Sequence, residues 1–322
     1  MCPVCKGIDH IPVGNALGEY RLMRCRSCGT VAAHPRPTPG ELMHFYNVHD
    51  EYNSPPAPLS AATAKRRAAR IAACIRRHAP AAASVLEIGC LHGHLLHGLR
   101  QHGFSVAGAD ICDSARQYAL STYGVTVHPG EVPPPSLEGG FDVLILSHVV
   151  EHLIAPVDFL RNASRFLKPG GLCLMEVPGL DTPLFRLFGE HFNMVKPPEH
   201  INFFDHDSGR ALHGQAGLDV VATQTYSPIL EQRTVYFYFL LSLANALGIM
   251  RAMKKKHSSH KQFGLASPLP PGKMGWLGQA MGIADIACRA LSVATFPLIR
   301  LADRMGKGLF LVVVSQKTSD LK

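Results

Sequence analysis

Between residues 84 and 177, apolar runs alternate with stretches that have helical periodicity. The runs SVLEIG, SVAGAD, FDVLILS and LCLMEVP are short and almost continuously apolar, which is typical of strands buried on both faces. LHGHLLHGLRQHG and DSARQYALSTYG, which follow the first two runs, have the periodicity of helices. Strands that alternate with helices in this way predict an α/β fold with a doubly wound, mostly parallel sheet.

Weaker patterns extend this prediction. VTVHPG, LDVVATQT and LFLVVVSQ are strand candidates, and APVDFLRNASRFLK predicts a helix over residues 155–168. Prolines and a short helix near Glu41–Tyr46 mark a linker, and a basic helix over 61–78 follows. We therefore expect five parts: a cysteine-bearing module (1–34), a linker with N-terminal helices (35–80), a core (81–225), a helical insertion (226–308), and a final strand and tail (309–322).

The insertion contains seventeen uncharged residues, Thr234–Met250, followed by the run Lys254–Lys256. The apolar stretch is shorter than the ~20 residues that a membrane-spanning helix needs. One hypothesis is a helix that lies on an anionic membrane face through residues 234–261. The other is a lid helix over an acceptor pocket, or a dimer surface, and residues 277–304 predict a second helix of the same kind. The oligomeric state stays open.

Charge and cysteine usage narrow the class of protein. The net charge is +8, yet residues 65–77 and 251–261 together carry eleven positive side chains and no acidic one. Positive charge in two patches argues against a nucleic-acid-binding protein. The first residues lack the apolar segment of a signal peptide, and five of the nine cysteines are scattered. We expect a cytoplasmic protein, with peripheral binding to the inner membrane face as the alternative.

Four cysteines form two CxxC pairs near the N-terminus: Cys2, Cys5, Cys25 and Cys28. Two thiolates three residues apart can occupy two corners of a tetrahedron, so two such turns complete a four-thiolate zinc site. A closed site of this kind leaves no position for substrate, and we expect the zinc to be structural. A redox pair and a partner-docking knuckle are the alternatives.

The turn after the first predicted core strand carries a nucleoside-site pattern. Gly89 and Gly93 permit a sharp turn and a close ligand, and Asp110 ends the next strand, where a carboxylate can bind both ribose hydroxyls. A nicotinamide dinucleotide is the obvious rival ligand. Glu87, however, would repel a pyrophosphate at this turn, and the G-x-G-x-x-G pattern is absent. The cationic ligand S-adenosylmethionine suits this carboxylate.

LEIGCLHGHLL resembles motif I of the class I methyltransferases, although Leu91 stands where that family usually has glycine. FDVLILSHVVEHL, LKPGG and EHINFFDHDSGRALHGQAGLDVV resemble later segments of the family, and the zinc module also occurs in it. The resemblance covers residues 1–225 and 309–317. It implies a seven-stranded sheet whose last strand is antiparallel, and a cofactor at the carboxyl ends of strands one, two and four. The remaining cofactor-binding residues implied there are Cys90, Ile111, Glu131, Val132 and Ser147.

Methyl transfer depends mainly on orientation, and a base is needed only for a protonated acceptor. His148, which ends the predicted fourth strand, is the first candidate base; His200 is the second, on a loop that could cover the acceptor. His152 is a third candidate, for which packing or capping is the stronger interpretation. The cluster His92, His94, His97 and His102 looks like a ligand set, but only His94 and His97 would share a helix face.

The resemblance implies transfer of a methyl group from S-adenosylmethionine to a small-molecule, glycan or glycolipid acceptor, most simply on oxygen. Methylation of a sugar carbon is the alternative reaction. A catalytically inactive zinc-containing binding protein and a nicotinamide-dependent sugar-modifying enzyme are hypotheses of other classes.

Overall fold

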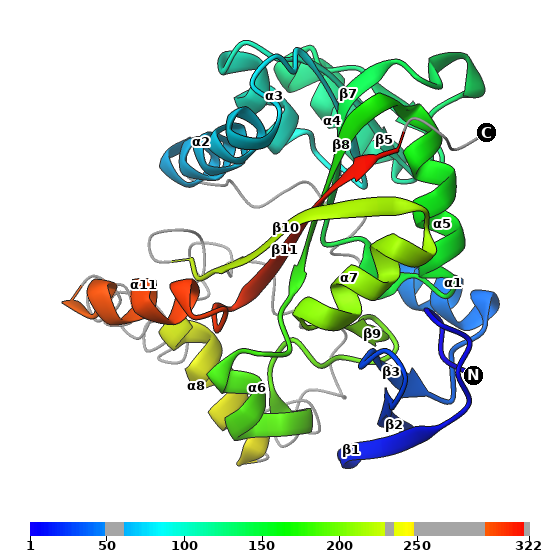
Figure 1. Cartoon of the computed structure of the whole chain (residues 1–322), viewed down its shortest axis with the longest axis vertical. Coiled ribbons are helices and arrows are strands. Elements are labelled where there is room, and N and C mark those ends of the chain that lie inside the picture. Colours follow the sequence, from blue (N-terminus) through cyan, green and yellow to red (C-terminus); the bar gives the residue numbers. More distant parts are fainter. Residues whose placement is uncertain (49–60, 229–234, 248–293, 319–322) are drawn as a thin grey trace.

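The computed structural model describes residues 1–48, 61–228, 235–247 and 294–318, and its centre is a seven-stranded sheet (Figure 1). The strand order is β10-β11-β8-β7-β4-β5-β6. Neighbouring strands from β8 to β6 are parallel, whereas β11 is antiparallel to both of its neighbours. The predicted doubly wound sheet with an antiparallel last strand is thereby confirmed. The strands are β4 (Ser84–Ile88), β5 (Ser105–Asp110), β6 (Val127–Pro129), β7 (Phe141–Ser147), β8 (Leu167–Pro178), β10 (Leu218–Tyr226) and β11 (Phe310–Lys317).

Successive side chains of each strand point alternately to the two faces of the sheet, and each face carries its own hydrophobic core. This explains the continuous apolar runs. Leu172 and Leu174 of β8 face one core, and Cys173 and Met175 face the other. The helices α2 (Ala61–His78) and α3 (His94–Gln101) cover the first face, and α5 (Pro156–Ala163) and α7 (His206–Gln215) cover the second. Another helix, α4 (Asp113–Tyr123), contacts β5 and β6 at the edge.

The helix predicted over residues 155–168 is shorter than expected. It ends at Ala163 and is followed by the 3-10 turn η3 (Ser164–Phe166), and Leu167 already begins β8. Leu167 pairs with Phe141 of β7, so Leu167 and Lys168 belong to the sheet and not to the predicted helix. Other short elements are η1 (Pro135–Leu137), η2 (Val150–His152), α6 (Pro183–Phe188) and η4 (Gly189–His191).

A second, four-stranded sheet lies beside the core at the N-terminal end of the chain (Figure 1). Its strands are β1 (His10–Leu17), β2 (Tyr20–Cys25), β3 (Val31–His34) and β9 (Asn202–Phe203), and α1 (Pro39–Val48) follows β3. All pairs are antiparallel. Because β9 comes from the loop before α7, the N-terminal residues are built into the same structure as the core. The domain boundary after residue 34 stays a prediction.

Two helices of the predicted insertion lie within the described residues. They are α8 (Val235–Ala246), which packs against α6 and η4, and α11 (Phe296–Arg304), which packs against β10. None of the described helices has the length and apolar character required to cross a bilayer. The lysine run 254–256 and most of the second predicted helix, 277–293, lie outside the described residues.

Candidate functional site

The turn between β4 and α3 depends on two glycines. Gly89 has φ +72°, and a Cβ atom there would come within 2.5 Å of Val149 Cγ2. Gly93 has φ +71° at the start of α3, and its Cβ would lie 3.0 Å from Ala119 Cβ. Other residues would be strained and crowded at both positions. The backbone therefore comes unusually close to its surroundings at the carboxyl end of β4.

Leu91 stands where the family that this turn resembles usually has glycine, and its backbone is left-handed. Its φ is +44°, and its side chain points outward, 42% exposed. The Leu91 N–H donates to Asp110 Oδ2 over 2.7 Å, which fixes the turn against the end of β5. The left-handed backbone costs a non-glycine residue about 1 kcal/mol. Leucine at this position therefore adds strain to the loop, but the backbone is still left-handed.

Asp110 joins the loops that follow β4 and β5. Besides the bond to Leu91, its Oδ1 accepts the N–H of Cys112 over 2.8 Å. Each carboxylate oxygen has a second lone pair, so the buried Asp110 can still accept hydrogen bonds from a ligand.

The other predicted cofactor residues lie around this junction. Cys90 is buried with Leu96 and Val125, and Ile111 is exposed beside Asp110. Glu131 is exposed and Val132 half-buried, and their loop begins where the Gly130 N–H bonds to Asp110 O.

A strip of polar groups crosses the carboxyl ends of three strands, on the face that α2 covers. It contains Glu87 of β4, Ser147 of β7 and Glu176 of β8, and all three are buried. Arg67 of α2 donates to Ser147 Oγ over 2.6 Å, and Arg70 to Glu176 Oε2 over 2.9 Å. Ser147 Oγ also donates to Glu176 Oε1 over 3.2 Å.

Glu87 differs from Glu176 within this strip. Its Oε2 is buried and has no hydrogen-bond partner among the described residues. Burial is the main cause that raises the pKa of Glu87 to about 8, and the charges of Asp110 and Glu176 add to it. For Glu176, burial also acts upward, but the charges of Arg70 and Arg67 outweigh it and lower the pKa to about 2. In this strip, Glu176 is paired with arginine, whereas Glu87 has an oxygen that can accept a further hydrogen bond.

Sequence reasoning did not identify Glu176, Arg67 or Arg70 as site residues. A signal existed, because Glu176 is the single charged residue of the run LCLMEVP, and a carboxylate in a doubly buried strand requires a partner. The partner comes from α2, about one hundred residues earlier in the chain, and nothing in the sequence specifies that pairing.

His148, which was expected to end the fourth strand, directly follows β7 and has φ +57°, a strained conformation for a non-glycine residue. Its Nδ1 lies 3.1 Å from Glu151 Oε1, and its Nε2 lies 3.7 Å from Glu176 Oε1. Burial acts to raise the pKa of Glu151, yet the hydrogen bond from His148 and the nearby histidines lower it to about 2. An ionised Glu151 fixes the ring with Nε2 as the outward atom, the arrangement of a base oriented by a carboxylate.

His200 and His152 lie beside this pair. His200 is buried and donates from Nδ1 to Met194 O over 2.7 Å; His152 donates from Nδ1 to Glu199 O over 2.9 Å. Their rings meet edge to face at 4.7 Å. Burial lowers the pKa of His200 to about 4, with a further contribution from His152. His152 is the last residue of η2, and the next helix begins at Pro156.

The described residues bring together two groups that could hold a metal ion. The first is the predicted set Cys2, Cys5, Cys25 and Cys28, whose sulfur atoms all lie within 4.8 Å of one another. The second is Glu151, His152 and His200, which the sequence did not indicate as a ligand set. His94 and His97 of the predicted histidine cluster contact Tyr123.

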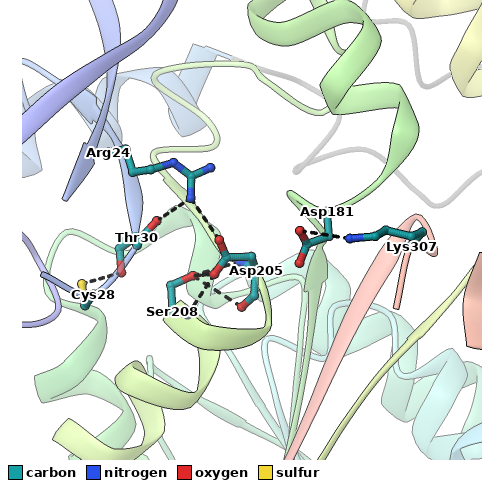
Figure 2. Close-up of polar contacts among 8 residues, drawn as sticks. Arg24, Cys28, Thr30, Asp181, Asp205, Ser208 and Lys307 are labelled. Atoms are coloured by element: carbon teal, nitrogen blue, oxygen red, sulfur yellow. Dashed lines mark hydrogen bonds and ion pairs between the residues drawn. The ribbon is translucent and has the colours of Figure 1, made fainter. Parts of the chain in front are cut away.

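The cysteine distances fit a tetrahedral zinc site. Cys2 Sγ lies 3.5 Å from Cys28 Sγ, and Cys5 Sγ lies 3.5 Å from Cys25 Sγ. Four sulfurs about 2.3 Å from one zinc ion would be about 3.8 Å apart, whereas a disulfide needs about 2.05 Å. The Thr30 hydroxyl lies 3.2 Å from Cys28 Sγ (Figure 2). Hydrogen bonds from Cys2 and Thr30 are the causes that lower the pKa of Cys28 to about 4, although burial acts upward.

Comparison with known proteins gives a family and several relatives. The sequence profile of a family described as a methyltransferase domain matches residues 61–223. A ubiquinone biosynthesis O-methyltransferase of Pseudomonas aeruginosa is 28% identical, over 46% of this chain and 70% of the relative. The Roseobacter denitrificans protein of the same description is 37% identical over 27% of this chain and 38% of the relative. A solved Thermotoga maritima structure, described as a SAM-dependent methyltransferase, possible histamine N-methyltransferase, is 17% identical, covers 87% of this chain and 95% of its own, and has a TM-score of 0.45.

Replacing Leu91 by glycine is expected to raise the free energy of unfolding by about 1 kcal/mol, because glycine adopts a positive φ without strain. Urea denaturation of Leu91→Gly measures this gain. Gly93→Ala is the matched control, and it should destabilise because of its φ of +71° and the nearby Ala119. Equal stability of Leu91→Gly and the wild type would show that Leu91 carries no strain.

The pKa of Glu87 predicts a pH-dependent stability. The folded chain keeps a proton up to about pH 8 that the unfolded chain releases near its ordinary value of 4.5. Since the folded state binds more protons in this window, the stability of the wild type should fall as the pH rises from about 4.5 to 8. Glu87→Gln removes this titration, so its stability advantage should grow across the window in thermal melts. Parallel pH profiles for the two proteins would contradict the assignment.

Proposed function

The chain belongs to the methyltransferase domain family and is an S-adenosylmethionine-dependent methyltransferase, and we propose that it methylates a hydroxyl group of a small-molecule or glycan acceptor. The observation that carries the proposal is the carboxylate-lined turn after β4. Glu87 offers an unpartnered buried oxygen, and Asp110 retains acceptor capacity beside it. A positively charged hydrogen-bond donor bound there would lower the raised pKa of Glu87 and pair with its carboxylate, whereas a phosphate would raise that pKa further, so the turn favours the cation.

The residues present fit the cofactor well. Gly89 lets the backbone approach it, Asp110 would accept the ribose hydroxyls, and Glu87 would face a donor group. Ile111, Glu131 and Val132 would border the adenine, with Cys90 and Ser147 supporting the loops. The guanidinium of Arg67 suits the carboxylate end of the cofactor. When bound, the cofactor supplies an electrophilic methyl carbon, so the chain itself has to orient an acceptor and manage its proton.

His148 is the preferred general base. Its Nδ1–H donates to the ionised Glu151, which leaves Nε2 to take the proton of an acceptor hydroxyl and stabilises the resulting imidazolium. His200 is a weaker proton acceptor near pH 7, because burial lowers its pKa to about 4. We therefore assign His200 and His152 to the wall of the acceptor site.

Two observations support oxygen as the acceptor atom and a working enzyme. The relatives from Pseudomonas aeruginosa and Roseobacter denitrificans carry the name O-methyltransferase. Leu91 preserves the left-handed turn, which supports a working cofactor loop over a degenerate one. Methylation of a sugar carbon is the second reaction that the same geometry allows, and no contact favours it.

Exposed leucines on α8 and α11 support peripheral contact with a membrane, and hence a lipid-linked glycan as acceptor. The two helices lie near each other at one end of the molecule (Figure 1). The exposed side chains are Leu240 and Leu243 of α8, Leu247 directly after it, and Leu298 and Leu301 of α11.

Asp110→Ala is expected to weaken the binding of S-adenosylhomocysteine at least tenfold, because a buried carboxylate that accepts hydrogen bonds is lost. Isothermal titration of the wild type with S-adenosylmethionine, S-adenosylhomocysteine and NAD is the parent experiment. Ser114→Ala on the exposed start of α4 is a control expected to bind normally. Binding of NAD alone, or unchanged affinity in Asp110→Ala, would refute the proposed cofactor site.

We further propose that the four cysteines hold one structural zinc ion. Elemental analysis of the purified protein should give about one zinc per chain, and Cys25→Ser should lose it because three thiolates bind zinc far more weakly than four. Cys74→Ser, a buried cysteine outside the cluster, is the matched control that should retain the metal. A metal-free wild type with a disulfide between these cysteines would exclude the proposal.

A further inference from the structure

The N-terminal sheet reaches directly into the loop that carries His200. Strand β3 pairs with β9 through Val31–Phe203 and Ala32–Asn202, and the Ala33 N–H donates to Ile201 O over 3.0 Å. Ile201, the acceptor of this hydrogen bond, directly follows His200 in the chain. The loop position is thus shared between the N-terminal sheet and the core.

Arg36 strengthens this connection with a fork of four hydrogen bonds. Its Nη1 donates to Ile201 O over 2.9 Å and to Asn202 Oδ1 over 2.7 Å. Its Nη2 donates to Leu153 O and Ile154 O, both over 3.0 Å. None of these acceptors is a carboxylate, and burial lowers the pKa of Arg36 to about 10. Burying a guanidinium without an ion-pair partner costs free energy, and here only the four hydrogen bonds offset that cost. The positions of the four acceptors are therefore important for the stability of this contact.

The two segments that Arg36 joins are those that carry the acceptor-side groups. Leu153 and Ile154 follow η2, which bears Glu151 and His152, and Ile201 follows His200. The Ile201 N–H donates to Glu151 O over 2.8 Å. Asn202 Nδ2 donates to Val150 O and Leu153 O over 3.1 Å and 2.7 Å. Arg36 therefore binds a small hydrogen-bonded unit made of residues 150–154 and 201–202. This unit sets the separation of Glu151 and His200.

The cysteine cluster is linked to the same unit from the other end of β3. Cys28 and Thr30 precede the strand, and Cys2 and Cys25 pack in one apolar cluster with Phe204, which follows β9. Arg24 donates to Gly29 O over 3.3 Å and to Asp205 Oδ2 over 3.1 Å, and Asp205 caps α7 with Ser208 (Figure 2). Metal bound by the cysteines would hold the start of β3 in place.

We propose that the N-terminal metal module is a positioning element of the acceptor site, and that Arg36 is the residue through which it fixes η2 and the His200 loop. The inference rests on the proposed function only in naming this region the acceptor side. Hydrogen bonds and strand pairs of residues 1–36 go to Leu153–Ile154, Glu190 and Ile201–Asp205. The module accordingly acts on the acceptor side, while the turn at Gly89 is fixed by Asp110.

Arg36→Met in the full chain tests the proposal, and Arg24→Met is the matched control. Both variants remove an arginine that joins the N-terminal sheet to the core, but only Arg36 contacts η2 and the His200 loop. In Arg36→Met, we expect amide exchange in peptides covering 149–155 and 199–204 to accelerate at least tenfold. Arg24→Met should leave both peptides within about twofold of the wild type. Arg36→Lys should resemble Arg36→Met, since an ammonium cannot serve the four acceptors in a fork.

Histidine NMR titration supplies a readout that lost stability alone does not move. The groups around His200 are His152 and Glu151 on η2 and Glu199 and Lys196 on its own loop. Opening this site to water should move the pKa of His200 from about 4 toward its ordinary value near 6.5 in Arg36→Met. Binding of S-adenosylhomocysteine should stay within about twofold of the wild type in both variants.

Removal of metal from the wild type with a chelator provides a second test should Arg36→Met fail to fold. It should accelerate exchange in peptides 199–204 and leave peptide 85–93 protected. Unchanged exchange at 149–155 and 199–204 after either treatment would overturn the proposal, as would equal effects of Arg36→Met and Arg24→Met. Failure of the wild type to bind S-adenosylhomocysteine would instead reject the proposed function, and these exchange measurements would still stand.

Discussion

Buried carboxylates at the carboxyl edge of the central sheet impose the main physical constraint on this protein. Glu87, Glu176, Glu151 and Asp110 are all almost inaccessible to water, and each must be compensated or must lose its charge. Glu176 is compensated by α2, Glu151 by His148, and Asp110 by two backbone N–H groups. Among the described residues, Glu87 and Glu151 each keep one buried oxygen without a hydrogen-bond partner, but the pKa is raised at Glu87 and lowered at Glu151. Glu87 is therefore the point at which a ligand can complete the structure.

The compensating groups divide the edge into two halves. On the proposed cofactor side, the compensating groups belong to the backbone, because Leu91 and Cys112 donate main-chain N–H groups to Asp110. On the proposed acceptor side they are side chains, since His148 bonds to Glu151 and the rings of His152 and His200 contact each other.

The N-terminal sheet helps to order the segment that carries His200. A loop as long as the one between β8 and α7 would cost much conformational entropy to order by itself. Here β3 gives it a strand partner, Arg36 supplies four donors, and Phe204 packs beside Cys2 and Cys25. The order of the loop thus depends on residues near the other end of the chain, and the cysteine cluster lies next to that contact.

Much of the fold and part of the site could be predicted from the sequence. Strand runs, the glycines of the turn, Asp110 and the cysteine pairs follow local rules, because periodicity, positive φ and ligand spacing are properties of neighbouring residues. The helix over 155–168 was predicted too long, because sheet pairing of Leu167 overrode the local pattern. The pairing of Arg70 with Glu176, the His148–Glu151 couple and the Arg36 fork were decided by tertiary structure alone. Their partners meet only after strands and helices pack, and the burial that makes those contacts strong does not exist in the unfolded chain.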